Sequence, residues 1–204
     1  RQVKAGNASV LTGRAVDADL VRKIQPDLLV WATGAVQNIP DIEGLDDQYW
    51  LTAVEYFRGD KDVQGPRVLV IGAGRAGLEI AEKLGKEGFE VVATKRTDPI
   101  GSFMEMITRN LTLKRIAGMP QVTLMPHTTV KSIGSEGVEV IQDEETKTLA
   151  AFQTVILAAG MRSAAAPDEG INKAVANVEI LGDAREVQEI FNAVHAGYDL
   201  ACRY

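Results

Sequence analysis

The sequence predicts an α/β fold, and three observations support that prediction. Nineteen glycines fall mainly at junctions between short β-branched runs and helical stretches. A strand, a glycine turn, a helix and a second strand follow one another without interruption over 67–94. Two further apolar runs, at 28–34 and 178–182, end in glycine, which is typical of strands buried in a parallel sheet.

The first sixty residues predict four short elements. A strand is expected near 7–12, and a helix at 19–24 with Asp17 as its N-cap. The apolar run 28–34 predicts a strand buried on both faces. After an acidic loop that contains a proline, a short helix is expected at 53–58.

The pattern is strongest from residue 67 onwards. The β-branched run 67–71 predicts a strand, and GAGRAG at 72–77 predicts a glycine turn. The segment 78–88 has apolar residues at helical spacing, and 89–94 predicts a second strand. Together these segments form one βαβ unit of under about 30 residues.

The remaining residues continue the alternation. A helix is expected at 102–117, and the acidic pair 144–145 predicts an exposed turn. Four strand-like runs lie between the helix and residue 158, three of them spaced like an antiparallel meander: 121–125, 129–133, 137–141 and 152–158. After the buried strand 178–182, a final helix from about 184 to 203 presents one apolar face, made of Val187, Ile190, Phe191, Val194 and Tyr198.

Composition and charge exclude several function classes. The 204 residues include 22 basic and 28 acidic side chains, for a formal net charge of −6, with no basic run of five, so neither nucleic acid nor an anionic membrane is an expected partner. No apolar run approaches the ~20 residues that a transmembrane helix needs. Because Cys202 is the single cysteine, an intrachain disulfide and a four-cysteine metal site are excluded. We expect a cytoplasmic protein, and since Arg1 opens in what looks like the middle of a domain, a piece of a longer one.

The glycine turn predicts a dinucleotide or ADP site. In such a site, Gly72 permits the tight turn, Gly74 lets the backbone approach a pyrophosphate, and Gly77 lets the helix pack against the strand. The helix N-terminus then offers free N–H groups to the phosphates, so Ala73, Arg75 and Ala76 belong to the same site. The alternative is a glycine-rich corner that binds nothing.

The end of the second strand favours NADP over NAD. A carboxylate about 20 residues after the glycine motif normally binds the adenosine ribose, but this sequence has Thr94, Lys95 and Arg96 there. The two basic side chains could form charge-assisted bonds to a 2′-phosphate, which a carboxylate would repel. The alternative is an ordinary solvated strand end.

No residue pattern predicts acid–base or nucleophilic catalysis. His127 and His195 lack metal-ligand spacing, and Ser163 lacks the context of a nucleophile elbow. No metal site and no catalytic side chain is therefore expected, which suits a protein whose bound cofactors carry the chemistry.

Four segments in this order resemble the flavin-dependent disulfide-reductase-like superfamily: PDLLVWATGA at 26–35, VLVIGAGRAGLEIAEKL from Val68, TVILAAGMR at 154–162 and VEILGDARE at 178–186. More narrowly, the chain is similar to the C-terminal region of the old-yellow-enzyme-related NADH:flavin oxidoreductases, which include 2,4-dienoyl-CoA reductase, 2-enoate reductase and trimethylamine dehydrogenase.

The resemblance implies a Rossmann-like, three-layer NAD(P)-binding domain at 63–160, inserted in an incomplete FAD-binding domain at 1–62 and 161–204. It implies that Ala159 and Gly160 lie near the nicotinamide. It places Thr33, Gly34, Gly182 and Asp183 at the flavin, and Glu79 at a position that is often acidic.

The same resemblance limits what this chain does alone. The family's FAD domain opens with its own GxGxxG, and this chain contains only the one at 72–77. We expect the remaining FAD contacts, an FMN barrel and an iron–sulfur cluster in missing N-terminal parts of the parent, which would be partners of this chain. An exposed sheet edge also makes a homo-oligomer an open prediction.

Two functions stay open. The chain could pass hydride from NADPH to FAD, or it could hold ADP as a structural module, as the corresponding region does in the amine-dehydrogenase branch of the family. The isolated fragment is expected to be inactive. The substrate of the parent enzyme is not encoded in this chain.

Overall fold

The computed structural model describes residues 6, 8–97 and 99–204, and it divides the chain into two compact units. Unit 1 comprises 1–36 with 162–204, and unit 2 comprises 37–161. The two chain segments that pass between the units pair as a two-stranded sheet, β2 (Ala35–Gln37) with β11 (Met161–Ser163).

A five-stranded sheet is the centre of unit 2, and all its pairings are parallel. Its strand order is β3-β10-β4-β5-β6, so segments distant in sequence become neighbours. The bounds are β3 Trp50–Thr52, β4 Arg67–Ile71, β5 Glu90–Thr94, β6 Val122–Met125 and β10 Thr154–Leu157. Because the strands are parallel, their carboxyl ends share one edge of the sheet.

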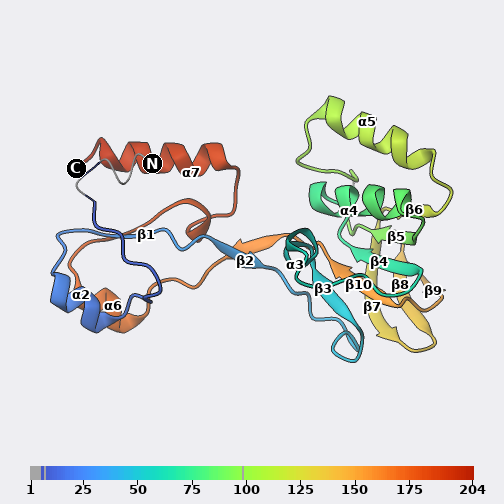
Figure 1. Ribbon diagram of the computed structural model, residues 1–204, viewed down its shortest axis with the longest axis horizontal. Helices are drawn as coiled ribbons and strands as arrows, with labels where there is room; N and C mark the ends of the chain where they lie inside the picture. Colours follow the sequence, from blue (N-terminus) through green and yellow to red (C-terminus); the bar gives the residue numbers. More distant parts are fainter. Residues whose placement is uncertain (1–5, 7, 98) are drawn as a thin grey trace. The chain divides into compact units, whose positions relative to one another are not determined.

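Two further layers cover the sheet (Figure 1). Helices lie on one face: α3 Ala53–Arg58, α4 Arg75–Lys86 and α5 Met106–Ala117. An antiparallel meander lies on the other: β7 Thr128–Gly134, β8 Gly137–Gln142 and β9 Glu145–Leu149. The predicted α/β, Rossmann-like three-layer fold is confirmed.

The strands of unit 2 are apolar on both sides because each side has its own core. In β4, Val68 and Val70 pack towards the helices, whereas Leu69 and Ile71 pack towards the meander. This alternation is the two-residue period of a strand buried on both faces. On the helical side, α4 contributes Leu78, Ile80 and Leu84, each fully buried.

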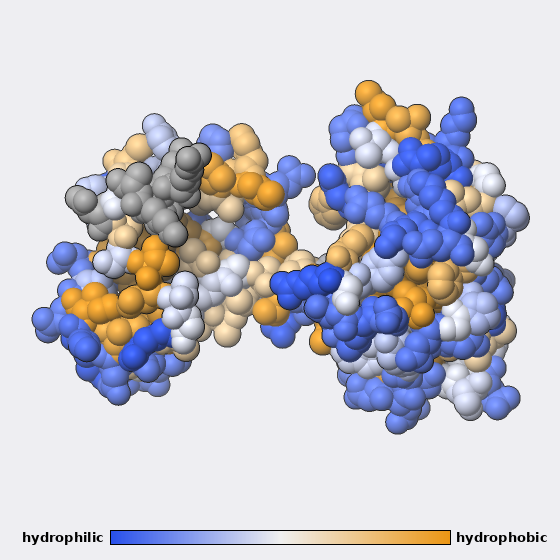
Figure 2. All heavy atoms as spheres, viewed as in Figure 1, coloured by the Kyte–Doolittle hydropathy of each residue, from blue (hydrophilic) through white to orange (hydrophobic). Residues whose placement is uncertain are grey.

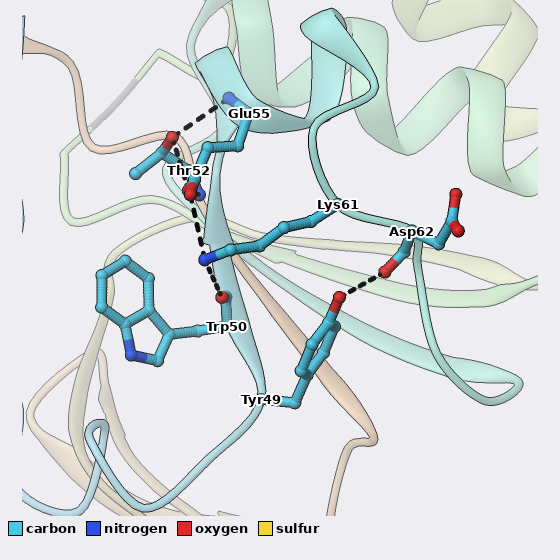
Figure 3. Close-up of polar contacts among 6 residues, drawn as sticks. All are labelled: Tyr49, Trp50, Thr52, Glu55, Lys61 and Asp62. Carbon is cyan, nitrogen blue, oxygen red and sulfur yellow. Dashed lines mark hydrogen bonds and ion pairs between the residues drawn. The ribbon is translucent and has the colours of Figure 1, made fainter.

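A polar cluster fastens the end of β3 to α3 (Figure 3). The Thr52 hydroxyl accepts from the Glu55 N–H at 3.2 Å, and the Glu55 carboxylate accepts from the Thr52 N–H at 2.8 Å, forming a capping box. Lys61 pairs with Glu55 at 2.9 Å and donates to the Trp50 carbonyl at 3.4 Å. The Thr52 N–H bond and Lys61 lower the pKa of Glu55, so this carboxyl group is ionised at neutral pH. Tyr49 donates to the Asp62 carbonyl at 2.8 Å and holds the segment that follows α3.

Unit 1 has a smaller sheet, in which β1 (Leu29–Trp31) pairs in parallel with β12 (Val178–Ile180). Asp17 caps the first helix by accepting from the Leu20 N–H at 2.8 Å, as predicted. The helical elements are α2 Ala18–Ile24, α6 Glu169–Ala174, the 3₁₀ turn Gly182–Ala184 and α7 Ile190–Ala201.

Several predicted elements of unit 1 differ from the structure. The strand expected near 7–12 is irregular over 8–12, and residue 7 lies outside the described residues. The strand expected at 28–34 ends at Trp31, and Val30 is 41% exposed, so burial on both faces was wrong. The predicted strand 178–182 ends at Ile180 and is half-buried, since among the described residues β1 and β12 pair only with each other.

The last helix also begins later than expected. Gly182–Ala184 forms a 3₁₀ turn, and the Asp183 carboxylate accepts from the Gln188 N–H at 3.3 Å, so α7 starts at Ile190 and Val187 precedes it. The rest of the predicted apolar face is exposed, between 63% and 84%, in the part of the chain that the structure describes: Ile190, Phe191, Val194 and Tyr198.

In unit 2 the differences are smaller. Helix α4 starts at Arg75 rather than 78, because the last glycine of the motif fits inside its first turn. Helix α5 starts at Met106 rather than 102, because Glu105 caps it by accepting from two N–H groups, at 3.0 and 2.9 Å. The turn lies at 143–144, and the polar strand β9 begins at Glu145. Strand β9 was missed because its burial is low and main-chain pairing with β8 holds it.

The division between the units also differs from the sequence-based domains. Residues 37–62 group with 63–161, whereas the sequence division placed them with the first domain. The physical reason is the pairing of β3 with β10, where Leu51 lies beside Ile156 at the edge of the five-stranded sheet.

Candidate nucleotide-binding site

A cavity of about 650 Å³ lies in unit 2 at the carboxyl ends of β4, β5 and β10. Ligands of open α/β sheets bind at this edge, outside the ends of the strands. The lining consists of residues 38, 40–42, 71–72, 74–76, 94–97, 102–103, 128–130 and 158–160.

The three motif glycines have three different surroundings. Gly72 has φ +108, and a Cβ there would lie 2.3 Å from the Ala158 carbonyl oxygen. A Cβ on Gly77 would lie 1.8 Å from the Gly72 carbonyl oxygen, so only glycine lets α4 approach the turn. A Cβ on Gly74 would meet nothing within 4 Å. Gly74 therefore turns an open face to the cavity, where a bound group could contact the backbone.

The start of α4 is open in the same way. Gly74 is its N-cap and provides no side-chain hydrogen bond to the first-turn N–H groups. These N–H groups and the positive end of the helix dipole favour an anion, such as a phosphate, at this place.

The end of β5 adds positive charge to the cavity. Lys95 is half-buried, and its backbone is fixed by bonds to Met125 O at 2.9 Å and from Thr128 N at 2.8 Å, whereas Arg96 is exposed. Together with Arg75, and counting described residues alone, they give the lining three cationic side chains against one carboxylate, that of Asp41. Among the described residues, no ion pair involves the side chain of Lys95 or Arg96, so both are available to an anionic ligand.

The opposite wall joins the end of β10 to the segment before β3. Asn38 N–H donates to the Gly160 carbonyl at 3.0 Å, and the Asn38 side-chain amide lies 3.4 Å from the Ala159 carbonyl. Gly160 has φ +88 and open space on its Cβ side. These contacts fix the position of Ala159 and Gly160 beside the glycine motif.

The structure therefore brings most of the predicted nucleotide residues of unit 2 together. Those that line the cavity are Gly72, Gly74, Arg75, Ala76, Thr94, Lys95, Arg96, Ala159 and Gly160. Ala73 and Gly77 are buried beside it. Glu79 is exposed on α4 and does not line the cavity.

Sequence reasoning missed other lining residues, notably Asn38, Pro40, Ile42 and Phe103. The first three reach the cavity because β3 adds to the far side of β10, a pairing that no local pattern reveals. For Phe103 a signal was present, since the segment directly after the second strand of a βαβ unit borders the nucleotide.

The four predicted flavin residues lie in unit 1. Thr33 and Gly34 follow β1, and Gly182 and Asp183 follow β12, so the two pairs share the carboxyl edge of the parallel pair. Gly34 (φ +77) has open space on its Cβ side, and Gly182 has φ +56. Asp183 is half-buried. A Cβ on Gly182 would lie 3.3 Å from the Ala193 Cβ, so Gly34 is the glycine that leaves an open face at this edge. Asp183 adds a carboxylate that can accept hydroxyl hydrogen bonds.

Neither histidine belongs to the cavity. The His195 ring lies 4.1 Å from that of Phe191 on α7, and His127 is outside the lining. Within the described ranges, no group of three or more His, Cys, Asp or Glu residues is placed to hold a metal ion. No helix in that part of the chain is long and apolar enough to cross a membrane.

Residues 2–190 match the family described as "Pyridine nucleotide-disulphide oxidoreductase". The chain is 28% identical to a bilirubin reductase of Mediterraneibacter gnavus, over 97% of this chain and 30% of that protein. It is 26% identical to an NADH oxidase of Thermoanaerobacter brockii, over 98% of this chain and 31% of that protein. A solved 2-naphthoyl-CoA reductase complex superposes with a TM-score of 0.77 at 25% identity, over 93% of this chain and 28% of that one.

The chain belongs to the pyridine nucleotide-disulphide oxidoreductase family, whose fold binds FAD and NAD(P). The predicted likeness to the nucleotide-binding region of old-yellow-enzyme-related flavoenzymes is confirmed. The chain spans about three tenths of the length of the relatives it matches.

Proposed function

We propose that this chain is the nucleotide-binding part of a larger flavin-dependent oxidoreductase, in which unit 2 binds NADPH and unit 1 contributes to an FAD site. One observation carries the proposal: the open face of Gly74 and the basic side chains of Lys95 and Arg96 line the same cavity. The first suits a pyrophosphate, and the second suits a 2′-phosphate at the adenosine end.

The wall opposite the basic side chains suits the nicotinamide. Backbone groups of Ala159 and Gly160, fixed by Asn38, present small residues with room for a flat ring. When bound, NADPH supplies a hydride and FAD accepts it. The residues of the chain then need only bind and orient, which agrees with a cavity lining that contains no histidine or cysteine.

The residues of unit 1 fit part of a flavin site. Gly34 allows a close backbone approach at one sheet edge, and Asp183 at the same edge would accept from ribitol hydroxyls. The second glycine motif that the family uses for the FAD pyrophosphate does not occur in these 204 residues. We therefore propose that FAD is held jointly with another part of the parent protein.

Parallel calorimetric titrations of the chain with NADPH, NADH and ADP test the proposal. We expect NADPH to bind more tightly than ADP, because only NADPH has both the 2′-phosphate and the nicotinamide. ADP binding equal to or tighter than that of NADPH would instead support the structural ADP module and contradict the electron-input role.

Two variants make the titration specific. Gly74→Val should abolish binding with the fold retained, because its φ of −78° suits valine and the added atoms enter the open face. Lys95→Glu should weaken NADPH binding roughly 10- to 100-fold, because one charge-assisted bond to the 2′-phosphate is lost. The affinity for NADH, which has no 2′-phosphate, should stay unchanged. Lys114→Glu, on the exposed side of α5 and outside the cavity, controls for the change in net charge.

A further inference from the structure

A phenylalanine ring stands in the wall of the cavity without a protein covering. Phe103 is 90% exposed, the highest value among the large apolar side chains that the structure describes. It lines the cavity together with Lys95 and Arg96. A flat, apolar ring exposed at a binding cavity is suited to cover an apolar face of a ligand.

The backbone around Phe103 is held in an unusual conformation. Its φ is +65°, which is uncommon for an aromatic residue. The Arg75 guanidinium donates to the Phe103 carbonyl at 3.1 Å, and the Gly101 N–H donates to the Ala73 carbonyl at 2.8 Å. Both partners belong to the glycine motif, so the residues that border a pyrophosphate also position the ring. Such strain is found where function requires a fixed geometry.

The position of the loop that carries Phe103 indicates which part of a dinucleotide the ring would contact. Residues 99–105 follow β5 and lead to α5 (Figure 1). In a βαβ dinucleotide unit the adenosine ribose lies over the end of the second strand, so the base attached to it reaches the loop that follows. Ala159 and Gly160 follow β10, which lies on the other side of β4 from β5, and they line the cavity there.

We propose that Phe103 stacks on the adenine base and thereby sets the affinity of the site for adenine nucleotides. This inference rests on the proposed dinucleotide site in unit 2. In that site the glycine motif and the basic side chains of Lys95 and Arg96 would contact the phosphates. Phe103 would contact the base. Stacking of one base on one aromatic ring corresponds to roughly a 5- to 100-fold change in affinity.

The test compares ADP affinity in the full chain and in Phe103→Ala, Phe103→Leu and Phe103→Trp. We expect Phe103→Ala and Phe103→Leu to lose roughly 5- to 100-fold, and Phe103→Trp to keep wild-type affinity, since stacking needs a flat ring. Phe57→Ala is the matched control: Phe57 is 53% exposed on α3, outside the cavity, and should bind ADP as wild type does.

Fluorescence gives a second readout. Stacked adenine should quench the added indole of Phe103→Trp, whereas Trp31 and Trp50 lie outside the lining and should not respond in the wild type. Unchanged ADP affinity in Phe103→Ala, or full affinity in Phe103→Leu, would overturn the stacking and leave the nucleotide site intact. A wild-type chain that binds neither ADP nor NADPH would overturn the nucleotide site itself, and the stacking with it.

Discussion

The two units of this chain bury their apolar residues to different extents. Unit 2 has a core on each face of its five-stranded sheet, with many side chains wholly buried. Unit 1 has one parallel pair of three-residue strands whose side chains are at most half-buried. Apolar side chains gather on its surface, for example over α2 and α6 (Figure 2), and Ile24 is 58% exposed.

Most of the stability of the described chain therefore resides in unit 2. A strand buried on both faces contributes apolar burial twice, whereas a half-buried strand contributes little. We therefore expect matched substitutions to be costly in unit 2 and nearly neutral in unit 1. Each unit contains one of the two tryptophans, Trp31 or Trp50, so Trp50→Phe and Trp31→Phe backgrounds report the unfolding of each unit separately.

Alanine substitutions at one helical glycine of each unit should differ most in their effect on the free energy of unfolding. Gly77→Ala in α4 places a Cβ 1.8 Å from a backbone oxygen, and we expect a loss of about 4 kcal/mol or failure to fold. Gly197→Ala in α7 meets nothing within 4 Å and should stabilise unit 1 by up to about 1 kcal/mol. Urea unfolding followed by tryptophan fluorescence measures both, and equal effects would contradict the difference between the units.

A pair of isoleucines tests apolar burial directly. Ile80→Ala removes a wholly buried side chain from α4 and should lower the free energy of unfolding of unit 2 by about 3 kcal/mol. Ile190→Ala acts on a side chain that is 84% exposed and should change unit 1 by less than about 0.5 kcal/mol. A large decrease in the free energy of unfolding for Ile190→Ala would show that the Ile190 side chain is buried against another part of the protein in solution.

An ion cluster between α4 and α5 predicts a dependence on pH. Glu82 accepts from Arg115 at 2.6 and 3.0 Å and from Lys86 at 2.6 Å, and its side chain is 11% exposed. The Arg115 bonds, helped by Lys86, lower the pKa of Glu82 from 4.5 to about 2. The carboxylate therefore stabilises the folded state above its unfolded pKa, and this stabilisation disappears as the pH falls towards 2.

We expect Glu82→Gln to lower the free energy of unfolding by about 2 kcal/mol at pH 7, with the difference from wild type falling below pH 4.5 and largely lost at about pH 2. The matched change in unit 1 is Glu179→Gln, whose partner Arg203 is 3.6 Å away and 58% exposed. Because that pair is solvated, its loss should not be measurable. Urea titrations at several pH values decide both, and a constant difference for Glu82→Gln would refute the cluster's role.

Removing a helix N-cap from each unit should change the free energy of unfolding least. Thr52→Ala removes a buried hydroxyl from the capping box of α3 and should cost unit 2 about 1 kcal/mol. Asp17→Ala removes the exposed cap of α2 and should cost unit 1 about 0.5 kcal/mol. The same unfolding curves measure these changes, and a larger loss for Asp17→Ala would reverse the order of the two units.

Local signals predicted the part of the site that lies close together in sequence. The unit from Arg67 to Thr94 folds as expected because strand period, helix period and a positive-φ glycine act within a few residues. Lys95 and Arg96 directly follow this unit, so their place at the cavity depends on where one strand ends.

The predictions failed where distant partners decide the outcome. Val30 is in a run that predicts burial on both faces, yet it is 41% exposed, since β1 pairs in the structure with β12 alone. The apolar face of α7 was predicted from the helical spacing of its apolar residues, but that spacing shows only which residues share a face. Whether anything covers that face depends on elements far away in the chain.

Neighbouring residues alone specify the βαβ unit, the glycine turn between its strand and its helix, and the basic end of β5. Only the tertiary structure decided that Asn38 meets Gly160 and that Phe103 stands in the wall of the same cavity. The strand order β3-β10-β4-β5-β6 brings these segments together, and strand order arises from pairing between residues as far apart as Leu51 and Ile156. Pairing between such distant residues cannot be predicted from a short stretch of the sequence.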